Sequence, residues 1–288
     1  MSALELDRVS RSFSMPDGRT YRALDEVSLA VPAGAFTAIV GPSGCGKSTL
    51  LNVAAGLLTP SSGQVRVNGQ PLEGLNRRAT YMFQQDALLP WKTVRENVAV
   101  GLTLSGVARL EAHARGDAWL ARVGLAGFAA HYPAQLSGGM RKRVVMAQNW
   151  IIDRPILLMD EPFSALDIHM RQQMETELLT LWDSTTESAE LAEKNDSLRS
   201  PRSPRLKKTV IFVTHDLEEA IALADTVVVL SAGPAAHIVA QYPVTLDRPR
   251  DLMELRTSPA FVETYRAIWA VLREEVVKSQ RAVETSRG

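Results

Sequence analysis

The stretch GPSGCGKST, residues 41–49, limits the folds open to this chain more than any other feature. It follows the apolar run AFTAIV, which is typical of a buried strand, and it opens a segment that we expect to be helical from Gly46 to about Gly56. Glycines in such a loop let backbone N–H groups converge on phosphate oxygens, and the helix N-terminus adds a partial positive charge. The sequence therefore predicts a loop that binds nucleotide phosphate.

Individual residues of this loop have expected roles. Lys47 should reach the β- and γ-phosphates, and Ser48 offers a hydroxyl to Mg²⁺. The thiol of Cys45 should be shielded by bound nucleotide. The predicted nucleotide-binding residues of the loop are Gly41, Pro42, Ser43, Gly44, Cys45, Gly46, Lys47, Ser48 and Thr49.

Two acids, a histidine and a glutamine follow other apolar runs. The run ILLM predicts a buried strand that ends at Asp160, positioned to hold Mg²⁺, and Glu161 is the candidate base that polarises an attacking water. Two acids at a strand end could be solvated turn residues, but the phosphate-binding loop favours a functional pair. His215 lies between the run TVIFVT and a capped helix, where it could reach a γ-phosphate. Gln84, after the strand ATYMF, could contact Mg²⁺ or the attacking water.

Apolar runs alternate with helical patterns along the chain. The runs AFTAIV, PILLM and TVIFV predict buried strands, and residues 138–152 and 168–182 have helical patterns. Thr93 and Glu96 form a capping-box signature before a further helical region. This alternation predicts a mostly parallel sheet that is covered on both faces.

Two segments fall outside this alternation. The segment at 184–208 is rich in Ser, Pro and charge, which predicts a flexible surface excursion; a regulatory role is the alternative. A helix should begin near Ser258 and carry an apolar stripe that packs on the domain, or that forms a partner surface instead. The stripe consists of Phe261, Tyr265, Ile268, Trp269, Leu272 and Val276.

Composition excludes several classes of protein. Lys+Arg and Asp+Glu each count 32 in 288 residues, so the net charge is zero and gives no overall basic footprint for nucleic acid. No apolar run approaches the ~18 residues of a membrane span, and charges interrupt the N-terminal region where a signal peptide would be apolar. The single cysteine allows no internal disulfide. We expect a soluble chain in a reducing compartment, held by another protein if it works at a membrane.

Six motifs occur in the order and approximate spacing of ABC transporter ATPase subunits, which this chain resembles over roughly residues 4–243. They are GPSGCGKST, the glutamine in YMFQQ, LSGGM, ILLMDEP, SALD and VTHD. The resemblance implies an α/β fold: a P-loop NTPase core of the ABC ATPase type, with a mostly parallel sheet, an antiparallel β subdomain and a helical subdomain. The implied domains are an ATPase domain at 1–243, its helical subdomain at about 90–152, and a C-terminal extension at 244–288.

The resemblance also assigns roles in binding ATP and Mg²⁺. A serine and two glycines at a helix start, Ser137–Gly139, are typical of a cap or of a phosphate cradle. In the family this segment binds the γ-phosphate of the nucleotide held by the opposing subunit, so a homodimer would sandwich two ATP molecules. Residues 164–167 resemble the loop that joins the two halves. The implied residues are Phe13 (or Tyr21) on adenine; Ser137, Gly138 and Gly139 on the partner's nucleotide; Lys47, Gln84, Glu161 and His215 in catalysis; and Ser48, Gln84 and Asp160 on the metal.

The stretch FQQDALLPWKTVREN is similar to that of importers of nitrate, sulfonates, taurine or pyrimidine precursors. In that group the segment at Gln84–Trp91 lies against a short cytoplasmic helix of the permease. The apolar residues at 88–91 would form a knob there, or they are simply core. The resemblance thus implies a peripheral ATPase on the cytoplasmic side of the inner membrane. Its partners would be permease subunits and, indirectly, a periplasmic or extracellular solute-binding protein.

The chain departs from the commonest family pattern, and rival functions exist. Met140 replaces the usual glutamine after LSGG, the segment at 184–208 is longer than expected, and a β-rich regulatory domain is missing from the tail. An exporter or lipid-extraction ATPase would share the chemistry. A DNA-maintenance ATPase would need long coiled-coil arms before LSGG, and a GTPase would need a base-reading Asn-Lys-x-Asp motif. Import of a small solute is the favoured interpretation.

Overall fold

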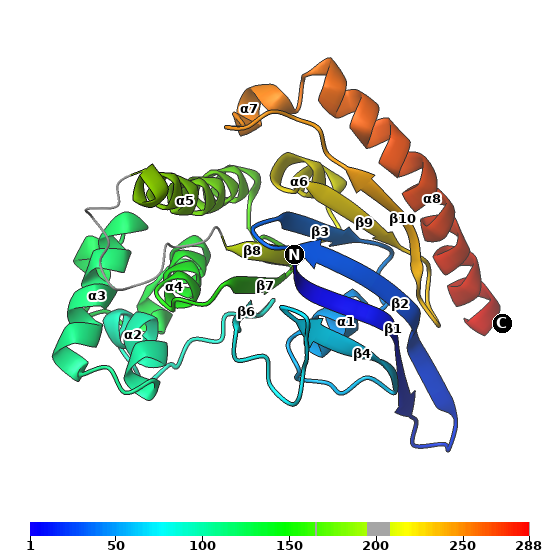
Figure 1. Cartoon of the computed structure of the whole chain (residues 1–288), viewed down its shortest axis with the longest axis horizontal. Helices are drawn as coiled ribbons and strands as arrows, with labels where there is room; N and C mark the ends of the chain where they lie inside the picture. Colours follow the sequence, from blue (N-terminus) through cyan, green and yellow to red (C-terminus); the bar gives the residue numbers. More distant parts are fainter. Residues whose placement is uncertain (165, 195–207, 288) are drawn as a thin grey trace.

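The computed structural model describes residues 1–164, 166–194 and 208–287, which fold around two β-sheets (Figure 1). The larger sheet has six strands in the order β10-β9-β3-β8-β7-β6. Its pairs β9–β3, β3–β8, β8–β7 and β7–β6 are parallel, and the edge strand β10 runs antiparallel to β9. The mostly parallel sheet expected from the sequence is therefore confirmed. The strands are β3 (Phe36–Val40), β6 (Ala79–Met82), β7 (Ile156–Asp160), β8 (Thr209–Val213), β9 (Thr226–Leu230) and β10 (Ile238–Pro243).

The smaller sheet is antiparallel and has the order β2-β1-β4-β5, which confirms the antiparallel β subdomain. Its long hairpin pairs Phe13 with Tyr21, the two candidate adenine-stacking aromatics, directly across from each other. The strands are β1 (Ser2–Ser14), β2 (Thr20–Pro32), β4 (Ser62–Val67) and β5 (Gln70–Pro71).

The four inner strands β3, β7, β8 and β9 send alternate side chains into two apolar layers. On β3, Phe36 and Ala38 join a layer shared with α5, α6 and α8, whereas Ile39 joins a layer shared with α1 and the smaller sheet. Because both faces of these inner strands are buried, each needs apolar residues at nearly every position, whereas the edge strand β10 alternates partly buried and exposed residues. The helices are α1 (Lys47–Ala54), α2 (Val94–Leu104), α3 (Arg109–Arg122), α4 (Gly138–Trp150), α5 (Ile168–Lys194), α6 (Leu217–Leu223), α7 (Leu252–Leu255) and α8 (Pro259–Arg287), with short 3-10 turns η1 (Ala126–Phe128) and η2 (Pro133–Gln135).

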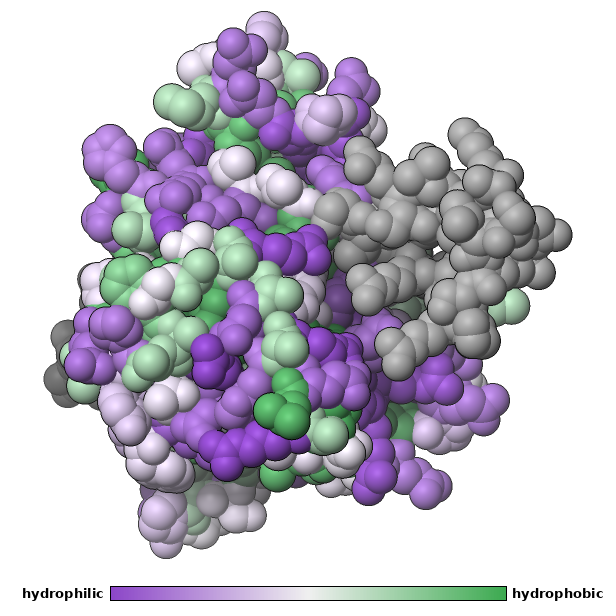
Figure 2. Space-filling model, turned by 90° about the vertical axis from the view of Figure 1, so that its left-hand side faces the viewer, coloured by the Kyte–Doolittle hydropathy of each residue, from purple (hydrophilic) through white to green (hydrophobic). Residues whose placement is uncertain are grey.

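Helices α2, α3 and α4 form a helical region to one side of the larger sheet, at the left of Figure 1. They share an apolar cluster that includes Val98, Leu120 and Val144. Helix α2 begins with the expected capping box, in which Thr93 and Glu96 bond to each other's backbone N–H. Seen from this side, the surface carries pale apolar patches interrupted by hydrophilic residues (Figure 2).

The C-terminal extension packs along the molecule through α7 and α8 (Figure 1). Helix α8 begins at Pro259, as expected, and buries Phe261, Ile268 and Leu272 against α6 and the larger sheet. The prediction that Trp269 belongs to the packed stripe is wrong, because Trp269 is 40% exposed and lies outside the core cluster that the other stripe residues join. The remaining stripe residues, Tyr265 and Val276, are partly buried.

Helix α5 departs from the prediction. It was expected to end at Trp182, but it continues to Lys194 and takes up the first part of the predicted flexible excursion. The rest of that excursion, residues 195–207, lies outside the described residues. Among the helices of the described ranges, none combines the length and apolarity that crossing a membrane requires.

Candidate active site

The loop between β3 and α1 has a backbone suited to enclosing a phosphate. Gly44 has φ +76° and open space where a side chain would project, and Gly46 has φ +100°. A Cβ on Gly46 would lie 3.1 Å from the carbonyl oxygen of Ala23, so glycine is required there for both conformation and space. This geometry supports the prediction made from the glycine spacing.

Lys47, the first residue of α1, lies across the same loop. Its Nζ donates hydrogen bonds to the carbonyl oxygens of Gly41 (2.9 Å) and Pro42 (3.0 Å), and the side chain is only 6% exposed. A buried ammonium held inside a glycine-rich loop is a strong electrostatic site for an anion, because little solvent screens it. The structure thus places a positive charge among the backbone groups that were predicted to bind phosphate.

The side chain of Cys45, itself a residue of this loop, is buried. Its Sγ would lie 2.9 Å from a Cβ on Gly41, and burial raises the pKa of the thiol. A buried thiol with a raised pKa is a poor nucleophile. Cys45 therefore fills space under the loop, and the loop itself shields it.

The side chains of Ser48 and Asp160 meet between α1 and the end of β7. Ser48 Oγ donates to Asp160 Oδ1 at 3.0 Å, and the hydroxyl of Tyr81 donates to Asp160 Oδ2 at 3.4 Å. Burial raises the pKa of Asp160, while the bond from Ser48 opposes this shift. A carboxylate and a serine hydroxyl beside a phosphate loop are oxygen donors that suit Mg²⁺. These residues fit the predicted metal site.

Gln84 was predicted to be a further metal ligand, but the structure engages its side chain elsewhere. Its Nε2 donates to Glu161 Oε2 at 3.0 Å. Its backbone carbonyl accepts a bond from Lys142 Nζ at 2.8 Å. A contact between Gln84 and a metal ion stays a prediction.

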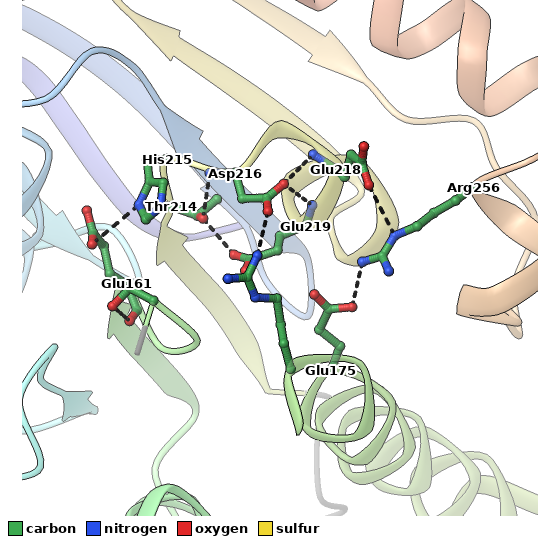
Figure 3. A network of polar contacts seen from close by, with 10 residues as sticks. Glu161, Glu175, Thr214, His215, Asp216, Glu218, Glu219 and Arg256 are labelled. Carbon is green, nitrogen blue, oxygen red and sulfur yellow. Dashed lines mark hydrogen bonds and ion pairs between the residues drawn. The ribbon is translucent and has the colours of Figure 1, made fainter. Parts of the chain in front are cut away.

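Glu161 and His215 come together at the ends of the neighbouring strands β7 and β8. Nδ1 of His215 lies 3.4 Å from Glu161 Oε2 (Figure 3). Gln84 contacts the same oxygen. Glu161 has φ +45°, which is a strained value for a residue with a side chain. Its backbone is held by bonds to Val213 and Ser164. The structure therefore places the candidate base between two of the other predicted catalytic side chains, Gln84 and His215.

The segment Ser137–Gly139 starts α4, as the capping prediction required. Ser137 Oγ accepts a hydrogen bond from the N–H of Met140 at 3.3 Å, and Ser137 and Gly138 are exposed. Gly139 is buried, and a Cβ there would lie 2.6 Å from Met170 Sδ on α5. Exposed Ser137 and Gly138 leave this helix start open to solvent, which suits a ligand that arrives from outside the chain.

The candidate adenine-stacking residues lie at the tip of the β1–β2 hairpin. Phe13 is partly buried, and the Arg11 guanidinium lies 4.7 Å from the centroid of its ring. Tyr21 is more exposed. A Cβ on Gly233 would lie 3.6 Å from the Tyr21 hydroxyl and 3.3 Å from the carbonyl oxygen of Gly44, which places Tyr21 in the neighbourhood of the phosphate loop. Both assignments stay open.

The predicted permease-contact segment is divided between core and surface. Leu88 is partly buried against two apolar clusters, so for this residue the core interpretation is correct. Trp91 is 72% exposed and Phe83 is also exposed. Of the apolar knob expected from LLPW, Pro90 and Trp91 are exposed and Leu89 is partly buried.

Sequence reasoning missed two side chains that hold this site together. Tyr81 donates to Asp160, and Lys142 is buried while its Nζ lies 2.9 Å from Asp86 Oδ1 and bonds to the Gln84 carbonyl. Tyr81 could have been found from the alternation of side chains along a strand. It pairs with Leu158 on β7, and Leu158 and Asp160 are two residues apart, so all three side chains lie on the same face of the sheet. Lys142 gave no such signal, because a lysine on an amphipathic helix is usually solvated.

Comparisons with known proteins identify the family of the chain. Residues 24–164 match the family model described as ABC transporter. The chain is 40% identical to an ABC transporter ATP-binding protein of Methanocaldococcus jannaschii, over 96% of this chain and 93% of that protein. It is also 40% identical to the taurine import ATP-binding protein TauB of Rhizobium johnstonii, over 93% of this chain and 96% of that protein.

Solved structures give the same result. A dimeric bacterial ABC transporter cassette is 28% identical and has a TM-score of 0.67, covering 85% of this chain and 100% of that chain. A dimeric ATP-binding cassette in a post-hydrolysis state, bound to ADP and Pi, has a TM-score of 0.66. The chain therefore belongs to the ABC transporter ATPases. Within that family, its relatives include subunits named for taurine import.

Proposed function

We propose that this chain hydrolyses ATP to drive an ABC importer for a small solute such as taurine, a sulfonate, nitrate or a pyrimidine precursor. The observation that carries the proposal is the cluster of Glu161, Gln84 and His215 beside the Ser48–Asp160 pair, at the edge of a phosphate loop. Relatives named for taurine import cover most of the chain, which supports import over export.

The residues suit an in-line attack of water on the γ-phosphorus. Glu161 accepts a proton from the water as the new O–P bond forms, and the bond between the γ-phosphorus and the β–γ bridging oxygen breaks to leave ADP and phosphate. Lys47 and His215 stabilise negative charge on the phosphate oxygens. Ser48 and Asp160 would hold Mg²⁺, which supplies further positive charge beside those oxygens. Gln84 fixes the orientation of the Glu161 carboxylate by its hydrogen bond.

We propose that the working form is a homodimer in which two chains sandwich two ATP molecules. The outward-facing start of α4 supports this, because Ser137 and Gly138 are exposed and their helix N-terminus is suited to an anion. The structural neighbours include dimeric cassettes, one of them bound to ADP and Pi. Phe13 or Tyr21 would stack on the adenine of the chain's own nucleotide.

The surface near Gln84 is the proposed contact with permease subunits. A groove of about 430 Å³ lies between β6, α2 and α4 and is lined by residues that include Phe83, Ala87 and Gly101. Phe83, which lines the groove, and Trp91, which follows four residues after Ala87, both have exposed apolar side chains. A groove of this kind fits a short helix of a membrane partner. The chain would thus be a peripheral subunit on the cytoplasmic side of the inner membrane, linked indirectly to a solute-binding protein.

The test is reconstitution of this chain with its permease and solute-binding protein, followed by ATPase assays with candidate solutes. Stimulation by taurine, alkylsulfonates, nitrate or pyrimidine precursors is expected. Trp91→Ala should leave basal hydrolysis by the isolated chain unchanged and reduce the solute-stimulated rate. If no candidate solute stimulates hydrolysis, the assigned importer subgroup is wrong. If the purified chain never hydrolyses ATP, the whole assignment fails.

A further inference from the structure

We propose that the C-terminal extension is a working part of the hydrolysis site, because it holds the helix that positions His215, with Arg256 as a positioning residue. This inference rests on the proposed role of His215 at the γ-phosphate. It concerns residues 244–288, to which sequence reasoning assigned only packing or a partner surface.

The first observation is that His215 sits in a turn fixed by its two neighbours. Thr214 Oγ1 donates to Glu219 Oε2 at 2.6 Å and accepts a bond from the N–H of Asp216 at 3.0 Å. Asp216 then caps α6 by accepting bonds from the N–H groups of Glu218 and Glu219. The backbone around His215 is therefore continuous with the first turn of α6, so a shift of α6 moves the imidazole (Figure 3).

Two arginines join this first turn to α5. Arg171 lies 2.9 Å from Asp216 Oδ2 and 3.5 Å from Glu219 Oε1. One helical turn further along, buried Glu175 accepts a 2.7 Å bond from Arg256, whose Nε lies 3.7 Å from Glu218. Arg256 closes the end of α7 in the extension, so a residue 81 positions away from Glu175 bridges α5 and α6.

The extension also holds the opposite end of α6. Arg250 Nη1 donates to the carbonyl oxygens of Ile221 (3.3 Å), Ala222 (3.0 Å) and Ala224 (2.8 Å), and Arg248 donates to that of Leu223 (2.6 Å). These are the last carbonyls of the helix, which have no partner within it. The extension therefore contacts α6 at both ends, and packing of α8 against α6 joins the two contacts.

The charges explain why Arg256 matters more than a surface ion pair. Glu175 is 0% exposed and accepts a hydrogen bond from the Arg256 guanidinium. Removing the guanidinium alone leaves a buried carboxylate without its partner, which destabilises a fold whatever the function. The informative variant therefore replaces both partners by methionine, which fills the space and leaves no buried charge.

The experiment compares wild-type chain with the double variant Arg256→Met/Glu175→Met and with Arg256→Lys. The double variant should fold and keep its KM for ATP, while kcat falls roughly tenfold to a hundredfold, because His215 is no longer held. Arg256→Lys keeps the charge but loses the planar fork that bridges two carboxylates, so we expect a smaller loss of kcat. Arg266→Met, at an exposed position on α8, is the matched control and should behave as wild type.

A spectroscopic measurement separates positioning from general stability. The chain has five histidines, so ¹⁵N-histidine spectra of the full chain are simple, and His215→Ala assigns the relevant ring. The double variant should shift the His215 ring signals and leave those of the other histidines in place. Unchanged His215 signals together with wild-type kcat in the double variant, or wild-type kcat in Arg256→Lys if the double variant does not fold, would overturn the inference. Wild-type chain without ATPase activity would instead contradict the proposed function.

Discussion

The phosphate loop and the start of α4 are both glycine-containing helix N-termini, yet they differ in what surrounds them. The loop at 41–49 contains a buried lysine and lies beside the buried Asp160. The segment at 137–139 exposes Ser137 and Gly138, and its cap bond stays within its own first turn. The same backbone device is enclosed in one case and presented outward in the other. Surroundings, rather than the motif, decide whether such a site serves its own chain or another.

The largest expected effect separates ATP binding from ATP hydrolysis in the enclosed half of the site, which is the loop at 41–49 with Asp160 and Glu161. Glu161→Gln keeps the hydrogen-bonding shape and removes the base, so ATP hydrolysis should fall by at least about 10²–10⁴-fold. Binding of ATP to the phosphate loop should persist, and the ATP-bound dimer should accumulate. Size-exclusion chromatography with ATP and a phosphate-release assay measure both. Hydrolysis near the wild-type rate would remove Glu161 from the role of base.

The next variant disrupts the outward half of the site, which is the segment Ser137–Gly139 at the start of α4. Ser137→Arg adds a bulky cation at an exposed position, so nucleotide binding by the chain's own loop should stay within about twofold, while hydrolysis by the homodimer should fall by about 10²-fold or more. Loss of the cap bond should cost only about 1 kcal/mol of stability. Fluorescent-nucleotide binding and ATPase assays provide the two measurements.

Mixed dimers make the comparison decisive. A dimer of one Ser137→Arg chain and one Glu161→Gln chain contains one site with both halves intact, if the halves come from different chains. It should therefore hydrolyse ATP more than about tenfold faster than either variant homodimer. If both halves came from the same chain, the mixed dimer would be as inactive as its parents.

A smaller effect concerns the stability of the first turn of α6, where Glu219 is buried. Burial raises the pKa of Glu219 from 4.5 to about 7, with its bond from Thr214 opposing the shift. Between these values the folded chain holds a proton that the unfolded chain releases, so the free energy of unfolding falls as pH rises through that window. Across this pH window the free energy of unfolding of the wild type should fall by on the order of 1–3 kcal/mol, and Glu219→Gln should remove this fall.

Urea unfolding at about pH 5 and about pH 8 measures that slope. Glu263→Gln, at an exposed position on α8, is the control and should keep the wild-type slope. Equal slopes in wild type and Glu219→Gln would show that Glu219 is already ionised in the folded chain at low pH.

The smallest expected effect is on stability, at the contact between Gly139 of the outward half and Met170 on α5. Gly139→Ala places a Cβ 2.6 Å from Met170 Sδ, but a methionine side chain can rotate away, and alanine favours the helix by about 1 kcal/mol. The net change in the free energy of unfolding should stay within about 1 kcal/mol. Thermal unfolding of Gly139→Ala, alone and with Met170→Ala, measures it. A much larger loss in the single variant would mean that Met170 is rigidly held.

Much of the enclosed half could be predicted from the sequence, because its parts are short contiguous patterns. The strand and loop ending at Lys47, the strand ending at Asp160 and the cap at Ser137 each need only local chemistry. Contacts between distant residues were not predictable in this way. Lys142 and Arg256 find their partners only through tertiary packing, and their spacing from those partners carries no signal.

The length of α5 shows a second limit. Residues 183–194 lack the apolar periodicity that marks a packed helix, so the prediction ended the helix at Trp182. The stretch contains Ala, Glu, Leu and Lys, which have high helix propensity, and the helix continues to Lys194. Burial pattern predicts which face of a helix packs, whereas it does not predict how far the helix extends beyond the packed part.

The burial of Cys45 has a practical consequence for measuring the motions of this protein. It is the chain's single cysteine, and its thiol is almost fully covered and has a raised pKa. Maleimide dyes need an accessible thiolate, so the native chain should take up label slowly. A cysteine introduced at the exposed position Trp91 would then be the dominant labelling site. Single-molecule distances between the two chains of a dimer could therefore be measured with one introduced cysteine, without first replacing Cys45.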